Sequence, residues 1–461
     1  MIHLRLAATA IGMAALVAAH PAITYSADRS VTTTEAGSLQ AILDAASPGD
    51  TITLEAGEYA APISVNKAVT LAGRPGASVV GNGQGSVITI TAPGAAVRSL
   101  VITGSGTDLT TLDSGVLAQK TATDARIEDN VITGNLFGIY LHGAVNSLAR
   151  GNRITGLTDG RRSSAGNGVT VWNAPGAQVL DNDIRFGRDG IATMASKRNV
   201  FRGNRFRDLR FGIHYMYTND SEVADNVSTG NSVGYAIMFS NRLKITDNLS
   251  DGDRDHGLLL NSANGSTISG NKVIGRLQPV DRWLTAAPQP SEPGVPKAEA
   301  PDATSAGNGG QRLGPEKCVF IYNANKNRFS SNRFEGCAIG IHFTAGSEGN
   351  AMAGNAFINN RNQVKYVGTR YIDWSADGRG NYWSDNPAFD LNGDGMGDNP
   401  YRPNDLIDQV LWTLPQAKVL TTSPAVQVIR WAQAQFPALL PGGVVDSHPL
   451  MAPPFHREAA P

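Results

Sequence analysis

Three methionines, Met194, Met216 and Met238, recur at intervals of 22 residues and occupy the same position of an internal repeat. Each lies four residues after a glycine, in the outward-pointing phase of an expected strand. A thioether is a soft ligand that selects Cu(I) over hard cations, and imidazole also suits copper. We therefore predict a Cu(I) site that is formed by these methionines with His214, next to Met216, and with His142, which occupies the methionine position of an earlier repeat.

The methionine column has a second interpretation. Methionine is a common gap-filler in hydrophobic cores because its side chain is flexible. If the C-terminal part of the chain folded back over the column, the three side chains would form a second core and would bind no metal. The sequence leaves both interpretations open.

The repeat itself indicates which elements position these side chains. An asparagine closes successive repeats, and three consecutive gaps are 22 residues each. The asparagines of this column are Asn130, Asn152, Asn182, Asn204, Asn226, Asn248, Asn271, Asn332 and Asn355. Self-similarity at such a period is the signature of a solenoid. We expect each asparagine to adopt the left-handed conformation of a sharp corner and its amide to bond within the stack.

Each repeat contains three short stretches in which apolar residues alternate with polar ones, as in strands with one buried face. The predicted fold is therefore all-β, a right-handed parallel β-helix with three short strands per coil of about 22 residues. A short helix around 38–46 is expected to cap its N-terminal end. The C-terminal unit is expected to be irregular and to contain one helix, Ser423 to Phe436, with Ser423 as its N-cap.

The expected domain organisation has three parts. Residues 1–27 have the charged, apolar and small-residue segments of a secretory signal peptide. Residues 28–370 form the β-helix, with corner insertions at 157–167 and 276–317, and residues 371–461 form a C-terminal docking unit. No later segment is long and apolar enough to span a bilayer, so the mature protein is expected outside the cytoplasm and not itself in the membrane. The net charge of −1 gives no electrostatic basis for nucleic-acid binding.

The two cysteines, Cys318 and Cys337, are expected to form a disulfide because the compartment is oxidising. A thiolate metal site is the alternative, although the chain has no CxxC pattern.

An acidic loop near the C-terminus has the oxygen spacing of a calcium-binding loop. Asp390, Asn392, Asp394 and Asp398 stand at positions 1, 3, 5 and 9 of the loop, with a glycine at position 6. Tyr401 replaces the glutamate that usually occupies position 12. The loop is therefore a candidate Ca²⁺ site, and an Asx-rich turn is the alternative.

A second functional hypothesis is a carbohydrate-active enzyme. Parallel β-helices often belong to polysaccharide lyases and epimerases. The run Asp253, Arg254, Asp255 and His256 resembles the Asp-Pro-His-Asp signature of alginate epimerases, with Arg254 in the proline position and the histidine last. The alternative interpretation of these residues is a solvated, charged corner.

Over nearly its whole mature length, the chain resembles the NosD family of accessory proteins in nitrous oxide reductase maturation. The similarity rests on 39–50 near the N-terminus and, at the other end, on Asn381-Tyr382-Trp383-Ser384, the acidic loop through Pro403, and 446–451. The resemblance implies a non-catalytic periplasmic protein. It implies work with an ABC transporter, made of a membrane subunit and an ATPase, in assembling the copper–sulfur centre of nitrous oxide reductase. It also implies that a lipoprotein copper chaperone supplies Cu(I). It leaves open whether sulfur is carried too, and it assigns no metal ligands.

Overall fold

The computed structural model of the chain describes residues 27–35, 37–158, 164–276, 314–344, 346–368, 370–413, 420, 423–435 and 442–455. The predicted signal peptide and most of the insertion at 276–317 lie outside these residues. Residues 159–163 of the shorter insertion also lie outside them.

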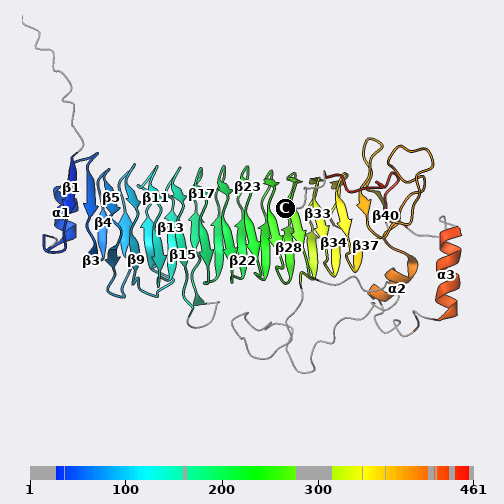
Figure 1. Ribbon diagram of the computed structural model, residues 1–461, viewed down its shortest axis with the longest axis horizontal. Coiled ribbons are helices and arrows are strands. Elements are labelled where there is room, and N and C mark those ends of the chain that lie inside the picture. Colours follow the sequence, from blue (N-terminus) through cyan, green and yellow to red (C-terminus); the bar gives the residue numbers. More distant parts are fainter. Residues whose placement is uncertain are drawn as a thin grey trace, which may run out of the picture.

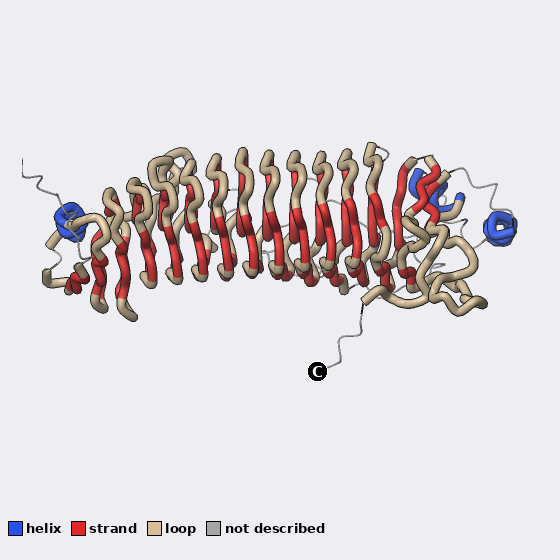
Figure 2. Tube along the Cα trace, turned by 90° about the horizontal axis from the view of Figure 1, so that it is seen from above, coloured by secondary structure: helices blue, strands red, loops and turns tan. Residues whose placement is uncertain are grey.

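The described residues form a long parallel β-helix with three sheets, whose strands run across its length (Figures 1 and 2). The chain passes from one sheet to the next and then to the following coil, as predicted.

The first sheet has 13 strands, β1 (Asp28–Val31), β2 (Thr51–Leu54), β5 (Thr70–Gly73), β8 (Ala96–Arg98), β11 (Arg126–Glu128), β14 (Leu148–Arg150), β17 (Gln178–Leu180), β20 (Val200–Arg202), β23 (Glu222–Ala224), β26 (Lys244–Thr246), β29 (Thr267–Ser269), β32 (Arg328–Ser330) and β35 (Ala351–Met352). The second also has 13, β3 (Gly57–Ala60), β6 (Ala77–Val80), β9 (Val101–Thr103), β12 (Val131–Thr133), β15 (Arg153–Thr155), β18 (Asp183–Arg185), β21 (Arg205–Arg207), β24 (Val227–Thr229), β27 (Leu249–Asp251), β30 (Lys272–Ile274), β33 (Arg333–Glu335), β36 (Ala356–Ile358) and β39 (Tyr382–Trp383). The third has 12, β4 (Ile63–Val65), β7 (Ile88–Ile90), β10 (Ser114–Ala118), β13 (Phe137–His142), β16 (Val169–Trp172), β19 (Asp189–Met194), β22 (Phe211–Met216), β25 (Val233–Met238), β28 (His256–Asn261), β31 (Lys317–Tyr322), β34 (Ile339–Thr344) and β37 (Asn362–Val367).

Alternation along each strand produces one continuous core inside the coils. In β22, Ile213 and Tyr215 are fully buried, whereas His214 and Met216 between and after them are only half-buried. Phe201 and Phe206 from the other two sheets complete the interior of the neighbouring coil. The same inward phase holds in successive coils, so a side chain that is one residue out of phase must point away from the core.

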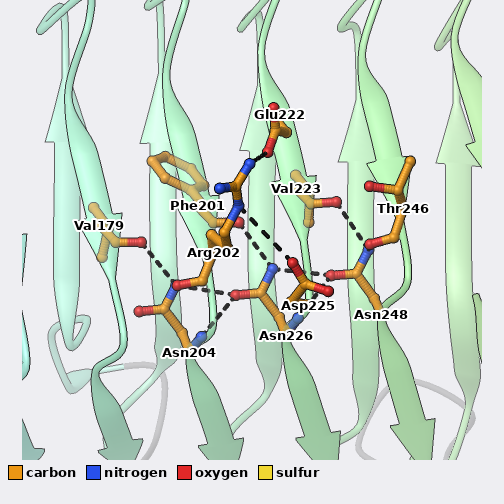
Figure 3. Close-up of polar contacts among 10 residues, drawn as sticks. All are labelled: Val179, Phe201, Arg202, Asn204, Glu222, Val223, Asp225, Asn226, Thr246 and Asn248. Atoms are coloured by element: carbon orange, nitrogen blue, oxygen red, sulfur yellow. Dashed lines mark hydrogen bonds and ion pairs between the residues drawn. The ribbon is translucent and has the colours of Figure 1, made fainter.

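The asparagine column forms a buried hydrogen-bonded ladder (Figure 3). The Oδ1 atom of Asn226 accepts bonds from the backbone N–H and the Nδ2 of Asn204, both at 3.0 Å. Its Nδ2 donates to Asn248 Oδ1 at 2.9 Å and to the backbone carbonyl of Phe201 at 2.9 Å. Every polar atom of this amide is therefore satisfied in the interior.

The predicted left-handed conformation falls one residue earlier than expected. Asp225, Asp247 and Gly203, which precede ladder asparagines, have φ values of 54°, 55° and 69°. The asparagine itself cannot be the left-handed residue, because its side chain must point inward to reach the amides of the next coil. Short aspartate side chains and glycine tolerate the corner instead.

The ends of the β-helix are closed by different means. At the N-terminal end, α1 (Leu39–Ala45) begins at Ser38, whose side chain accepts a bond from the backbone of Ala41, as predicted. At the other end, a returning segment contacts Asn381, which directly precedes β39, and Trp383 within it. The Asp446 carboxylate of this segment accepts bonds from Asn381 N–H at 2.7 Å and from Trp383 Nε1 at 2.7 Å. Asp446 thus ends the asparagine ladder.

The C-terminal unit contains two helices where the sequence predicted one. The predicted helix is α3 (Pro424–Gln435), and the additional one is α2 (Leu406–Thr413). The signal for α2 is a reciprocal cap, because Asp405 and Asp408 each accept a bond from the backbone N–H of the other. A short strand pair, β38 (Tyr371–Asp373) with β40 (Gly443–Val445), completes the unit.

Within the described residues, no helix has both the length and the apolar character needed to cross a membrane.

Candidate metal centre

The methionine column lies on the outer face of the third sheet. Met194 pairs with Met216, and Met216 pairs with Met238, on the consecutive strands β19, β22 and β25. Met194 is 40% exposed and the other two are half-buried. Their sulfur-bearing side chains therefore do not belong to the interior core, as the spacing predicted, and neighbouring rungs are about 4.8 Å apart.

His214 lies beside the methionine column on the same face. In the strand register its neighbours on either side are the small residues Ala192 and Ala236, and its side chain is 16% exposed. Three thioethers and one imidazole thus lie on the same face of three consecutive strands. This donor set fits Cu(I), because every member is a soft or borderline ligand.

The buried carboxylate of Asp189 contacts the His214 ring. Asp189 Oδ2 lies 3.1 Å from His214 Nδ1, and Arg210 binds both carboxylate oxygens, at 2.8 Å and 2.6 Å. Burial opposes ionisation of Asp189, but the bonds from His214 and Arg210 outweigh it, and the pKa of Asp189 is lowered. Asp189 was not predicted from the sequence, although its position directly before Gly190 places it at the start of β19, the strand adjacent to that of His214.

His142 does not join this group. It occupies the methionine position, but Trp172 separates it from Met194 by one full rung. The His142 and Trp172 rings stack with their centroids 4.6 Å apart. An ion that bound Met216 and Met238 would lie several rungs away from this imidazole.

Two exposed aromatic residues border the methionine column. Tyr217 and Phe239, which directly follow Met216 and Met238, are 53% and 39% exposed. Both have a φ of 49°, a left-handed conformation that is strained for aromatic residues, and their rings stack at 5.1 Å. The same corner position is also left-handed in neighbouring coils, at Ala195 and Ser262 with φ values of 53° and 52°, so the conformation belongs to the repeat and only the exposed aromatic pair is particular to these two coils.

The side-chain oxygens of the acidic loop accept hydrogen bonds from backbone N–H groups of the same loop. Asp390 accepts bonds from the N–H groups of Gly393 and Gly395 at 2.6 Å and 2.7 Å. Asn392 and Asp394 each accept a backbone N–H bond two residues ahead, at 3.0 Å and 2.9 Å. Asp398 Oδ2 accepts the N–H of Leu391 at 2.8 Å. This geometry supports the Asx-rich turn.

The residues of the enzyme hypothesis do not form one surface. Asp253 is fully buried and takes an asparagine-like role at an inner corner, where it accepts bonds from Asn231 N–H at 2.8 Å and Ser250 Oγ at 2.6 Å. Burial raises the pKa of Asp253 to about 7. His256 lies on the outer face of β28 beside Phe320, and burial lowers its pKa to about 4. Because Asp253 points into the interior, it cannot contact a polysaccharide.

The cysteines form the expected disulfide between Cys318 of β31 and Cys337, so neither supplies a thiolate. Among the described residues, no three His, Cys, Asp or Glu side chains come together as a metal-binding group. Within this part of the chain, the methionine column with His214 is therefore the candidate metal centre.

Comparisons with known proteins agree with the architecture. A tailspike protein, Dettilon gp208, has the same kind of fold, with a TM-score of 0.50 and 15% identity over 69% of this chain and 62% of its own. At that identity the likeness concerns the fold alone.

Two proteins are much closer in sequence. The "probable ABC transporter binding protein NosD" of Stutzerimonas stutzeri is 40% identical over 404 residues, 88% of this chain and 87% of its own. Its counterpart in Pseudomonas aeruginosa strain PAO1 is 38% identical over 401 residues, 87% of this chain and 88% of its own. The profile of the family described as "Periplasmic copper-binding protein (NosD)" matches residues 151–388, which include the methionine column. This protein is therefore a member of the NosD family of periplasmic copper-binding proteins.

Proposed function

We propose that this protein binds Cu(I) on the outer face of the third sheet and delivers it for assembly of the copper–sulfur centre of nitrous oxide reductase. The observation that carries the proposal is the in-register column of Met194, Met216 and Met238 beside His214. The copper is cargo, bound and released by the protein. The protein itself performs no covalent chemistry.

The exposure of the column supports delivery. A stored metal is usually enclosed, whereas Met194 and the adjacent Tyr217 and Phe239 remain open to solvent. An exposed apolar patch of this kind marks a contact surface for another protein. A lipoprotein copper chaperone would load the ion here, and nitrous oxide reductase would receive it.

The C-terminal unit would meet the ABC transporter. The two close relatives are named as ABC transporter binding proteins, and α3 presents Val428 and Trp431, which are 62% and 63% exposed. We propose that this apolar helix face contacts the membrane subunit, while the ATPase on the cytoplasmic side hydrolyses ATP.

Anaerobic Cu(I) titration against a chromogenic competitor tests the binding site. Replacing all three column methionines with leucine keeps the side-chain volume and removes the sulfur atoms. We expect the affinity for Cu(I) to fall at least tenfold, about 1.4 kcal/mol. Met451, which is 38% exposed in the C-terminal unit, provides a matched control, and Met451→Leu should leave the affinity unchanged. Equal affinities in the triple variant and the wild type would exclude the column.

Co-purification with the membrane subunit tests the docking proposal. The V428S/W431S variant should lose the complex, because both side chains are exposed and their removal does not disturb the core. A control in the same unit is F389S/L391S, whose side chains are 54% and 83% exposed. Retention of the complex by the α3 variant would contradict the proposal.

A further inference from the structure

Asp189 makes a buried contact with His214 and would itself touch no metal. The inference drawn from this contact rests on the proposed copper site. Asp189 has a side chain only 2% exposed, and it bonds to one nitrogen of His214, which is 16% exposed. An imidazole that binds a metal through one nitrogen commonly donates its other N–H to a carboxylate, which fixes the tautomer and the ring orientation.

The position of the carboxylate determines which nitrogen is free. Asp189 is the first residue of β19 and Met194 is the last, and His214 lies between these levels on the adjacent strand β22. Because Nδ1 contacts Asp189, Nε2 is the ring nitrogen left for a metal ion. Nε2 has no hydrogen-bond partner among the described residues.

Arg210 and Phe211 make this arrangement rigid. The Arg210 guanidinium binds both oxygens of Asp189, and it also lies 4.3 Å from the centroid of the Phe211 ring. Phe211 in turn meets the His214 ring edge to face, with centroids 5.1 Å apart. The carboxylate therefore cannot turn away, and the imidazole has a neighbour on one side that limits its rotation.

We propose that Asp189, clamped by Arg210, is a positioning residue that keeps His214 in the Nδ1–H tautomer and presents Nε2 to Cu(I). A purely structural ion pair would need no histidine. The chain contains such a pair for comparison, because Asp183 binds Arg207 of the next coil at 2.9 Å and 3.1 Å on the second sheet without contacting an imidazole.

The first test needs neither a variant nor copper. Nitrogen-15 chemical shifts of the His214 ring in the metal-free protein report its tautomer directly. We expect protonated Nδ1 and unprotonated Nε2 at a pH where the imidazole is neutral. Protonated Nε2 would overturn the proposal, whatever the protein's affinity for copper.

The second test is a double-mutant cycle on Cu(I) affinity. Asp189→Asn should reduce the affinity by about 10- to 100-fold. In a His214→Ala background the same change should have little further effect, because the carboxylate acts through the imidazole. Asp183→Asn, the matched control, should leave the affinity unchanged.

The outcomes separate this proposal from the wider one. Independent, additive losses from Asp189→Asn and His214→Ala would remove Asp189 from its positioning role while leaving the copper site intact. Failure of the wild type to bind Cu(I) would defeat the proposed function, and the tautomer measurement would still decide how Asp189 holds His214. If Asp189→Asn folds poorly, the tautomer measurement on the wild-type protein still tests the proposal.

Discussion

The asparagine ladder and the methionine column are two stacks of identical side chains with the same 22-residue period, and they have opposite surroundings. Asn226 lies inside the coils and every polar atom of its amide has a partner in a neighbouring coil. Met216 lies outside the coils, half-buried, and its neighbours in the strand register are Met194 and Met238. Repetition in the first stack is explained by the hydrogen bonds it makes. The second stack makes no hydrogen bonds of this kind, and we propose that a bound ligand accounts for its repetition.

The largest expected effect comes from breaking the ladder. Asn226→Leu would remove the acceptor of the buried backbone N–H of Asn204. It would also remove one hydrogen bond each from the Asn204 amide, the Asn248 amide and the carbonyl of Phe201. Since each unsatisfied buried group costs about 1–3 kcal/mol, we expect the free energy of unfolding to fall by about 3 kcal/mol. Chemical denaturation followed by circular dichroism measures it. The control, Asn241→Leu, affects a half-buried amide that water can reach, and equal losses in both variants would contradict the role of burial.

Asp253→Asn should stabilise the protein in a pH-dependent way. Burial raises the pKa of Asp253 to about 7, above the value of 3.8 expected when unfolded, so the folded state binds the proton more tightly. The contribution of Asp253 to wild-type stability should therefore be largest at low pH and should be lost as the pH rises from about 4 to about 7. The asparagine variant does not lose stability in this way. The difference in unfolding free energy between the variant and the wild type should therefore be about 2 kcal/mol larger at pH 8 than at pH 5. Thermal unfolding at the two pH values measures the difference, and an advantage independent of pH would refute it.

A smaller gain is expected from Tyr217→Asn. Relief of the left-handed strain should contribute about 1–2 kcal/mol, and loss of the ring contact with Phe239 should cost about 0.5–1.5 kcal/mol. The net increase in unfolding free energy is then about 0.5 kcal/mol. If the aromatic pair serves as a contact surface, transfer of Cu(I) from the chaperone should become slower while the affinity for Cu(I) is unchanged. A decrease in affinity would instead make Tyr217 part of the metal site.

The smallest effect on stability is expected for Met216→Leu, the counterpart of the ladder variant. The substitution conserves volume on a half-buried surface position, so unfolding free energy should change by less than about 0.5 kcal/mol. A loss close to that of Asn226→Leu would show that the methionine column is a structural core after all. Denaturation of the two variants side by side decides between these outcomes.

Much of this architecture could be predicted because the repeat couples sequence spacing to position in space. The Asn-to-Gly and Gly-to-Met distances placed Met194 correctly on the outer face. The left-handed residue was assigned one position late, because spacing alone does not distinguish the corner residue Asp225 from the inward Asn226.

The predictions that the structure does not support concern contacts that cannot be inferred from the 22-residue spacing. His142 has the right offset, but the identity of the intervening Trp172 separates it from the methionines. Asp253 stands three residues before His256 in sequence and yet its side chain points into the interior, whereas His256 lies on the outer face. Asp189 was missed because it acts across coils, on His214 in the next strand.

The way in which Asp446 completes the ladder has a consequence for assembly. Each coil presents strand edges to which a further coil can bond, and the repeat itself does not determine how many coils form. The returning carboxylate supplies the acceptor that another asparagine would have supplied, and it carries no amide to donate onward. Asp446 therefore ends the hydrogen-bonded ladder at this coil. A protein shortened before this residue would present a bare cross-section ready to receive a further coil, and end-to-end growth into filaments would become possible.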